Sequence, residues 1–142
     1  MTAPTVITVQ TTIAAPIAHV WECWTTPTHI TEWNAASPDW HTPHSTVDLQ
    51  VGGTFSSRME AKDGSFGFDF WGTYTIVNAP TELAYTIGDG RNVHIQFIAN
   101  GSDTTIIEQF EAEATNPVDM QRFGWQSILD NFAAYTTRTQ PT

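Results

Sequence analysis

The 142-residue chain is long enough for one domain with a substantial core, and its 40% hydrophobic and 12% aromatic content excludes a disordered chain. Five Lys and Arg against fifteen Asp and Glu give a net charge of −10, which repels phosphate backbones and anionic lipids and argues against nucleic-acid and membrane partners. Cys23 is the only cysteine, so neither an intramolecular disulfide nor a thiolate metal cluster can form.

The beginning of the chain predicts a strand followed by two short helices. Residues 6–13 form a β-branched run that is typical of a strand. Apolar residues at helical spacing then predict a helix over residues 17–24, which Pro27 ends, and a second short helix over residues 29–34. The proline-containing residues 35–45 are expected to form a loop.

The sequence also bears on the location of the protein. Its first eight residues lack the basic and apolar regions of a signal peptide. No apolar run approaches the ~20 residues that cross a bilayer. We therefore expect a cytoplasmic protein.

Six further strands are expected before a C-terminal helix. They lie at residues 46–51, 54–61, 66–77, 83–87, 93–99 and 104–113. Gly52-Gly53 ends the first of them, and Asp63-Gly64 is a strong signal for a hairpin between the next two. No linker or internal repeat divides the chain, so residues 1–142 are expected to be a single domain.

A two-residue turn at Asp63-Gly64 determines the register of its hairpin. The pairs on the inward face are then Ala61 with Phe66, Met59 with Phe68, Ser57 with Phe70 and Phe55 with Gly72. On the other face Arg58 opposes Asp69 as a cross-strand ion pair. The hairpin therefore presents an apolar face to the interior.

The same procedure places a carboxylate on the inward face of the last strands. A loop at residues 100–103 sets Ile95 opposite Glu108 and Val93 opposite Phe110, and a shift by one residue would move Glu108 to solvent. A buried carboxylate must be paired, neutralised or hydrated, and a raised pKa would suit an acid, a base or an anchor for a ligand. The structural alternative is that a neighbouring side chain or water satisfies Glu108.

The last predicted element is a long amphipathic helix over residues 116–135. Asn116 suits the N-cap, Pro117 the first helical position, and Asp119 can complete the cap. The apolar stripe consists of Val118, Trp125, Ile128, Leu129 and Phe132. Gly124 interrupts the helix at a cost of roughly 1 kcal/mol, which indicates close packing or an opening at this point.

A curved sheet against this helix is expected to enclose a cavity. Gly67 and Gly72 lie within a strand and mark bends. One helix cannot fill a strongly curved sheet face, so we expect a cavity in the usual range of ligand pockets, ~300–1,000 Å³. The predicted ligand-binding residues are Trp33, Phe55, Met59, Phe68, Phe70, Tyr74, Ile95, Glu108, Phe110, Trp125 and Leu129.

Other chemistries find little support in the sequence. Asp39, His41 and His44 lie close together, but no second pair of ligands has the spacing of a zinc site, and we expect neither a metal nor a cofactor. Gly52-Gly53 lacks the Lys-Ser/Thr ending and the following helix of a phosphate loop. Cys23 is expected to be a buried, inert thiol.

Several motifs resemble the SRPBCC superfamily. They are Ala15-Pro16-Ile17-x-x-Val20-Trp21, Trp33-Asn34, Asp48-Leu49-x-Val51-Gly52-Gly53-x-Phe55, Phe70-x-Gly72-x-Tyr74 and Gly124-Trp125-x-x-Ile128-Leu129-x-Asn131-Phe132-x-x-Tyr135. The chain resembles most the bacterial stand-alone domains called activator of heat-shock-protein-90 ATPase homologue-like, or polyketide cyclase-like. Residues 58–70 are typical of a subgroup of that branch, and the resemblance covers residues 6–136, the expected core.

The resemblance implies an α+β helix-grip fold. In this fold a curved antiparallel sheet wraps around a long C-terminal helix, and two short helices follow the first strand. The superfamily binds lipids, steroids, polyketides and other hydrophobic molecules in a central cavity. The branch shares no catalytic motif, so no catalytic residue is carried over, and the fold alone does not determine the function.

Three functions remain open at this point. The first is binding of a hydrophobic small molecule (lipid, steroid, polyketide or flavonoid-like), with Glu108 as a polar anchor and an entrance near residues 33–43. The second is an enzyme of polyketide cyclase or dehydratase type, in which Glu108, His41 or Tyr74 acts as acid or base. The third is a chaperone-regulating interaction domain. The sequence is compatible with a monomer or a homodimer.

Overall fold

The computed structural model describes residues 5–140. The described part excludes residues 1–4 and 141–142. The first of these ranges belongs to the segment in which a signal peptide would lie. The elements in chain order are β1 (Val6–Ile13), α1 (Ile17–Thr25), α2 (Pro27–Trp33), β2 (Trp40–Val47), β3 (Thr54–Ala61), β4 (Gly67–Asn78), β5 (Glu82–Ile87), β6 (Asn92–Asn100), β7 (Asp103–Glu111) and α3 (Val118–Thr139).

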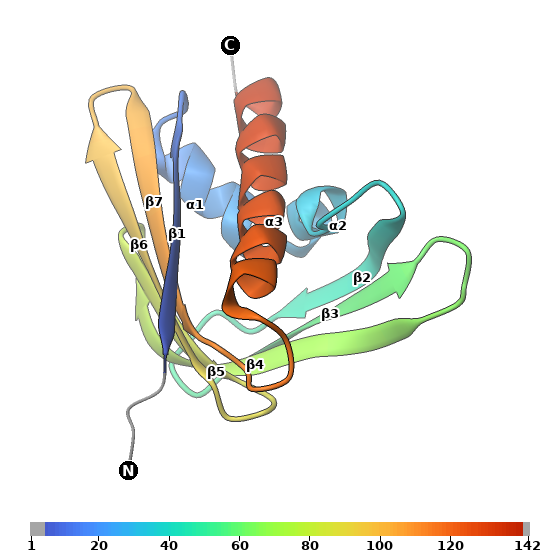
Figure 1. Ribbon diagram of the computed structural model, residues 1–142. Coiled ribbons are helices and arrows are strands. Elements are labelled where there is room, and N and C mark those ends of the chain that lie inside the picture. The colour runs from blue at the N-terminus through green and yellow to red at the C-terminus, as the bar shows by residue number, and fades with distance from the viewer. Residues whose placement is uncertain (1–4, 141–142) are drawn as a thin grey trace.

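The strands of the described chain form one seven-stranded antiparallel sheet in the order β1-β7-β6-β5-β4-β3-β2. The sheet curls around α3, which stands along its concave side, and α1 and α2 lie behind α3 (Figure 1). This is the α+β helix-grip arrangement predicted from the sequence.

The predicted registers of the two hairpins are confirmed. Met59 pairs with Phe68 in β3 and β4, and Ile95 pairs with Glu108 in β6 and β7. Arg58 opposes Asp69, with Nη1 of the arginine 3.5 Å from Oδ1 of the aspartate. Because side chains alternate between the two faces of a strand, the second register turns Glu108 inward.

An aromatic contact joins the three helices. Leu129 and Phe132 of α3 are fully buried. The ring of Phe132 lies 4.8 Å from the rings of Trp24 and of Trp33, edge-to-face in both pairs. Such pairs contribute about 0.5–1.5 kcal/mol beyond the burial of their area. Val118, predicted as part of the same stripe, is instead 36% exposed at the start of the helix.

The prediction is wrong for β2, which begins inside the expected loop at residues 35–45. The pairing of β2 with β3 shifts register between His41 and His44. Pro43 has no N–H to donate and lies in this irregular part of an edge strand, a position where proline is tolerated. Residues 48–51, expected to be strand, lie after the end of β2 and lead into a turn at residues 51–52.

The start of α3 also differs from the prediction. Pro117 is the N-cap in place of Asn116, and no side chain caps the helix. The buried Gln121 instead binds the segment before the helix: its Nε2 donates to the carbonyl of Glu113 at 3.0 Å and to that of Asn116 at 2.8 Å. A side-chain amide therefore joins the first turn to the segment that enters it, a contact that sequence periodicity does not reveal.

The β3–β4 hairpin extends from the rest of the molecule as an arm (Figure 1). Phe66, predicted to face inward, is 62% exposed near its tip, and Phe68 is 41% exposed. The inward prediction for Phe66 is wrong because the arm reaches past the helices that would cover this ring. The ring of Trp40 lies 6.0 Å from that of Phe66 and 6.1 Å from that of Phe68.

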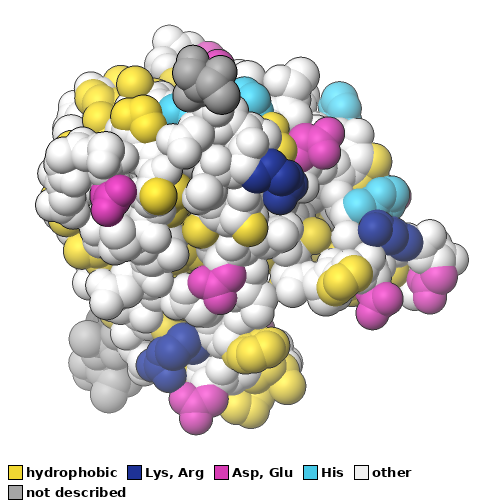
Figure 2. All heavy atoms as spheres, turned by 90° about the horizontal axis from the view of Figure 1, so that it is seen from above, with side chains coloured by type: hydrophobic (Ala, Val, Ile, Leu, Met, Phe, Trp, Pro, Cys, Tyr) yellow, Lys and Arg dark blue, Asp and Glu magenta, His cyan; other side chains and the backbone are white. Residues whose placement is uncertain are grey.

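The surface carries few basic side chains. On the face shown in Figure 2 the basic side chains lie near acidic ones, and hydrophobic side chains reach the surface at several places. None of the helices within residues 5–140 is both long enough and apolar enough to cross a bilayer.

The helix contact predicts a large difference between two phenylalanines of α3. Phe132→Ala should lower the free energy of unfolding by about 3–5 kcal/mol, because it leaves a cavity between three helices. Phe123→Ala is the matched control, because Phe123 is 75% exposed, and should change it by less than about 0.5 kcal/mol. Urea unfolding monitored by circular dichroism measures both, and equal losses would contradict this account of the core.

Gly124 does not serve close packing, because no atom lies within 4 Å of the place where its Cβ would be. Gly124→Ala should therefore raise the free energy of unfolding by about 1 kcal/mol, the difference in helix propensity between the two residues. The same urea experiment measures it, and a destabilised variant would show that the glycine is needed at this position.

Candidate functional site

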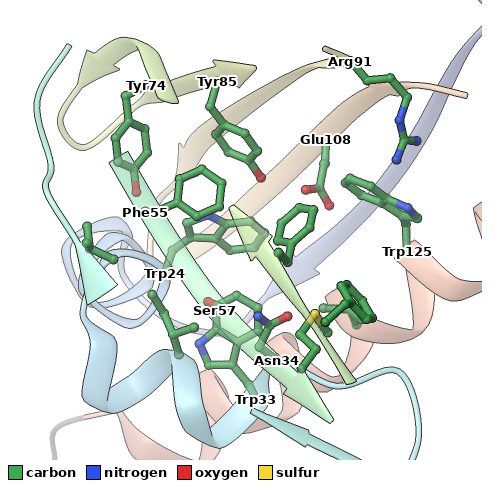
Figure 3. Close-up of a pocket in the computed structure, with 16 residues that line it drawn as sticks. Trp24, Trp33, Asn34, Phe55, Ser57, Tyr74, Tyr85, Arg91, Glu108 and Trp125 are labelled. Carbon is green, nitrogen blue, oxygen red and sulfur yellow. The ribbon is translucent and has the colours of Figure 1, made fainter. Parts of the chain in front are cut away.

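A cavity of about 270 Å³ lies between the concave face of the sheet and the helices (Figure 3). Its volume is close to the lower end of the range of ligand pockets, ~300–1,000 Å³. The lining residues come from all three helices, five strands and two loops: Trp24, Ile30, Trp33, Asn34, Val47, Phe55, Ser57, Met59, Phe68, Phe70, Tyr74, Tyr85, Arg91, Glu108, Trp125 and Ile128.

Aromatic rings form most of the walls. The indole of Trp125 on α3 stacks on the ring of Phe110 in β7, with centroids 3.8 Å apart and an interplanar angle of 10°. Phe55 on β3 meets the ring of Tyr85 edge-on at 4.7 Å. Its partner in β4 is Gly72, where an added Cβ would lie 2.9 Å from the Phe55 ring. Gly72 therefore leaves Phe55 the space that it occupies beside the cavity.

Glu108 projects from β7 into this aromatic environment, and only 5% of the residue is exposed (Figure 3). Its sheet neighbours, Val9 on β1 and Ile95 on β6, are apolar. Burial, with no hydrogen bond or charge from residues 5–140 to offset it, raises the pKa of Glu108 to about 8. No side chain of the described part forms a hydrogen bond or an ion pair with the carboxylate. The alternative that a neighbouring side chain pairs with Glu108 therefore does not hold for these residues.

Two tyrosines add hydroxyl groups to the site. Tyr85 on β5 points its hydroxyl toward Glu108 in Figure 3. Burial and then the charge of Glu108 raise the pKa of Tyr85 well above its usual value. Burial, followed by the charge of Asp48, raises the pKa of Tyr74 to about 12. Both phenols therefore stay neutral near pH 7 and can each donate or accept a hydrogen bond.

Arg91, from the turn between β5 and β6, reaches the cavity beside Trp125 (Figure 3). Its Nε donates to Oδ2 of Asp89 at 2.8 Å, and its Nη1 donates to the carbonyl of Glu111 at 3.0 Å. Within the described residues, no ion pair joins its guanidinium to Glu108. Arg91 thus pairs with Asp89, and its positive charge does not offset the negative charge of an ionised Glu108.

Most of the predicted ligand-binding residues come together in this cavity. Those that line it are Trp33, Phe55, Met59, Phe68, Phe70, Tyr74, Glu108 and Trp125. Ile95, Phe110 and Leu129 do not line it: they are at most 1% exposed and pack in the core behind it. Sequence alternation assigns a residue to a face, but it does not separate the part of that face covered by helix from the part facing open space.

Sequence reasoning missed four polar lining residues, Asn34, Ser57, Tyr85 and Arg91. Tyr85 belongs to the alternating apolar face of β5, together with Leu83 and Ile87, so the pattern needed to find it was present. Arg91 lies in a turn, where no periodicity indicates the direction of a side chain. Its position depends on the contacts with Asp89 and Glu111, which only the folded chain brings together.

His41, a candidate acid or base, lies outside the lining. Its Nε2 is 3.5 Å from Oε1 of Glu60, and the pair is on the partly exposed outer side of β2 and β3. Among residues 5–140, no three His, Cys, Asp or Glu side chains are placed to hold a metal ion. Cys23 is fully buried with Sγ 3.5 Å from Nε2 of His19, and burial raises the pKa of its thiol.

Comparison with known proteins identifies relatives of this fold and sequence. A family model described as "Activator of Hsp90 ATPase homolog 1-like protein" matches residues 14–137. The solution NMR structure of the AHSA1-like protein from Aeromonas hydrophila is 48% identical, with a TM-score of 0.89 over 94% of this chain and 93% of that chain. The branch that the sequence motifs resemble is thereby confirmed.

Two further structures extend the comparison. A protein from Cytophaga hutchinsonii is 49% identical, with a TM-score of 0.81 over 93% of this chain and 92% of that chain. A protein from Nitrosomonas europaea has a TM-score of 0.83 over 99% of both chains at 18% identity, which shows a shared fold alone. No curated protein matches this chain.

The environment of Glu108 predicts how stability depends on pH. Its pKa is about 8 in the folded state and near its usual 4.5 in the unfolded state. Below pH 4.5 the group is protonated in both states and has no effect. From about pH 5 to 8 only the unfolded state ionises, so stability falls by about 1.4 kcal/mol per pH unit, and it levels off above pH 8.

Glu108→Gln should abolish this fall. From about pH 5 to 8 the variant should therefore become more stable relative to the wild type, by about 1.4 kcal/mol of unfolding free energy per pH unit. Asp69→Asn, at a carboxyl whose side chain is 62% exposed on the opposite face, should show no such slope. Urea unfolding at several pH values measures both, and a constant difference for Glu108→Gln would contradict the burial argument.

Proposed function

The chain belongs to the activator of Hsp90 ATPase homolog 1-like family, and on this premise we propose that it binds a hydrophobic small molecule in the cavity. The observation that carries the proposal is an aromatic-walled space into which a buried, unpaired carboxylate projects. A fold gains nothing from such a carboxylate unless something else contacts it, because its desolvation destabilises the folded state. A ligand with an apolar body and one polar end would contact both the aromatic walls and the carboxylate.

The lining gives the ligand two different ends. Glu108 and Tyr85 place polar groups at one side of the cavity, whereas Trp24, Trp33 and Ile30 give the helix side a largely apolar lining, to which Asn34 adds an amide (Figure 3). Ligand pockets of this kind use apolar walls for affinity and a few polar groups for orientation. A lipid, steroid, polyketide or flavonoid-like molecule has this distribution of polarity.

The entrance lies between the β3–β4 arm and α3 in this proposal. Phe68 lines the cavity and is 41% exposed, and Ile128 on the facing helix is half-buried. The segment 33–43, expected beside the entrance, contributes Trp33 and Asn34 to the lining. Ligand entry therefore requires only displacement of side chains at the mouth of the cavity.

An enzyme of polyketide cyclase or dehydratase type is the second reading. Glu108 and Tyr85 face the same cavity, which gives two titratable groups within reach of one substrate. A carboxyl with a pKa of about 8 is suited to proton transfer near neutral pH. If this reading holds, the Glu108→Gln variant should lose turnover and still bind the substrate. If Glu108 only anchors a ligand, the same variant should bind the ligand more weakly.

The family description also suggests a contact with Hsp90. The surface best suited to a protein partner is the exposed aromatic cluster of Trp40, Phe66 and Phe68 on the arm. A pull-down with purified Hsp90, using Phe66→Ser as the control variant, tests this reading. Retention that the variant abolishes would favour the chaperone role over the pocket role.

A variant that fills the cavity tests the pocket itself. Ile128→Trp enlarges a lining side chain of α3 and should weaken binding of the neutral dye Nile red by about tenfold or more, because overpacking closes the space. Arg122→Trp adds the same ring on the exposed side of the same helix and should leave binding unchanged. Fluorescence titration measures both affinities, and thermal unfolding checks that the variants fold.

Native mass spectrometry of the purified wild type complements this test. A co-purified mass that disappears in Ile128→Trp would supply the chemical class of the ligand. Equal dye affinity in wild type and both variants would contradict binding in the cavity.

A further inference from the structure

Of the two charged groups that line the cavity, one has a partner of opposite charge among the described residues and the other does not. Glu108 and Arg91 are the acidic and the basic side chain of the cavity lining among the described residues, because the phenols of Tyr74 and Tyr85 stay neutral near pH 7. Arg91 is paired with Asp89 at 2.8 Å and donates to the carbonyl of Glu111 at 3.0 Å. Glu108 has no such partner within the described chain. The one missing charge in the cavity is therefore positive.

The walls around this carboxylate favour the same sign. The faces of aromatic rings carry negative electrostatic potential and attract cations, most strongly in tryptophan. Trp24, Trp33 and Trp125 line the cavity together with the rings of Phe55 and Phe70. In Figure 3 the indole of Trp125 lies next to the carboxylate of Glu108. A cation beside Glu108 would thus contact a ring face as well as a carboxylate.

The groups that face Glu108 from the surrounding elements do not neutralise it. Tyr85 on β5 contributes a neutral hydroxyl, Arg91 is held by Asp89, and the neighbours on β1 and β6 are apolar. The whole chain carries a net charge of −10, which raises the local concentration of cations and lowers that of anions. Glu108 and the net charge of the chain therefore both favour a positive ligand, and Arg91, which Asp89 neutralises, is the opposing charge of the lining.

We infer that the natural ligand is a hydrophobic organic cation, an amine or quaternary ammonium whose nitrogen lies beside Glu108 and Trp125 while its apolar part fills the aromatic cavity. This inference rests on the proposed binding function and specifies its ligand class. A neutral lipid or polyketide can hydrogen-bond only with the carboxyl of Glu108, whereas a cation can also form an ion pair with its ionised form. Binding should also release a proton at pH 7, because the ion pair favours the ionised carboxylate.

Two probes of the same shape isolate the charge. Benzyltrimethylammonium is a permanent cation, and neopentylbenzene is its uncharged isostere, with carbon in place of nitrogen. Neither probe titrates, so any dependence of its affinity on pH comes from the protein. Ligand-observed NMR titrations from pH 6 to pH 9 give both dissociation constants.

We expect the cation to bind at least about tenfold more tightly than the isostere at pH 9. Its affinity should fall about tenfold per pH unit as the pH drops below the Glu108 pKa of about 8, while the affinity of the isostere stays constant. In wild type this pH profile needs no variant, so it remains informative if a substitution impairs folding.

Glu108→Gln should abolish both the preference for the cation and its pH profile. Asp69→Asn removes one exposed charge from the outer face and should retain both. Loss of the preference to the same extent in the two variants would show general attraction to an acidic protein and overturn the role of Glu108. Equal or tighter binding of the isostere, with a flat pH profile, would also overturn the cation assignment.

The Nile red titration separates the two proposals. Dye binding in the cavity without preference for the cation leaves the binding function intact and refutes the ligand class. Failure of the dye and of both probes to bind refutes the binding function, and with it the inference that depends on it.

Discussion

The curvature of the sheet is the constraint on which the rest of this molecule depends. Seven antiparallel strands curl around one helix, and α3 cannot reach the whole concave face (Figure 1). Irregular pairing between His41 and His44 and between Tyr74 and Ile76 interrupts the ladder at the β2–β4 side of the sheet. Gly72 lies on the same side, beside Phe55. A void between this part of the sheet and the helices is thus a consequence of backbone geometry.

A void of this kind is tolerated because the other half of the structure is tightly packed. Phe132 meets Trp24 and Trp33 at 4.8 Å, and Leu129 is fully buried beside it. These contacts hold the three helices against one another without filling the cavity. The core and the cavity therefore depend on different residues of the same helix: Ile128 and Trp125 line the cavity, while Phe132 packs in the core.

The strand registers could be predicted because turn length and side-chain alternation are local properties. The turn signal at Asp63-Gly64 was sufficient to give the register of β3 and β4, and the short loop at residues 100–103 was sufficient to place Glu108 inside. Features set by distant parts of the chain were not predictable. The exposure of Phe66 depends on how far the arm extends beyond the helices, and the direction of Arg91 depends on Glu111, a residue on another strand.

The position of Glu108 argues for a ligand more strongly than the cavity does. An apolar cavity alone reduces packing and needs no explanation beyond the curvature of the sheet. A carboxylate in its wall adds a second destabilising contribution, which an apolar residue of similar size at the same register would avoid. The carboxylate points toward the cavity, beside the hydroxyl of Tyr85 and the ring of Trp125. A bound molecule of opposite charge would therefore offset the destabilisation that the burial of Glu108 causes.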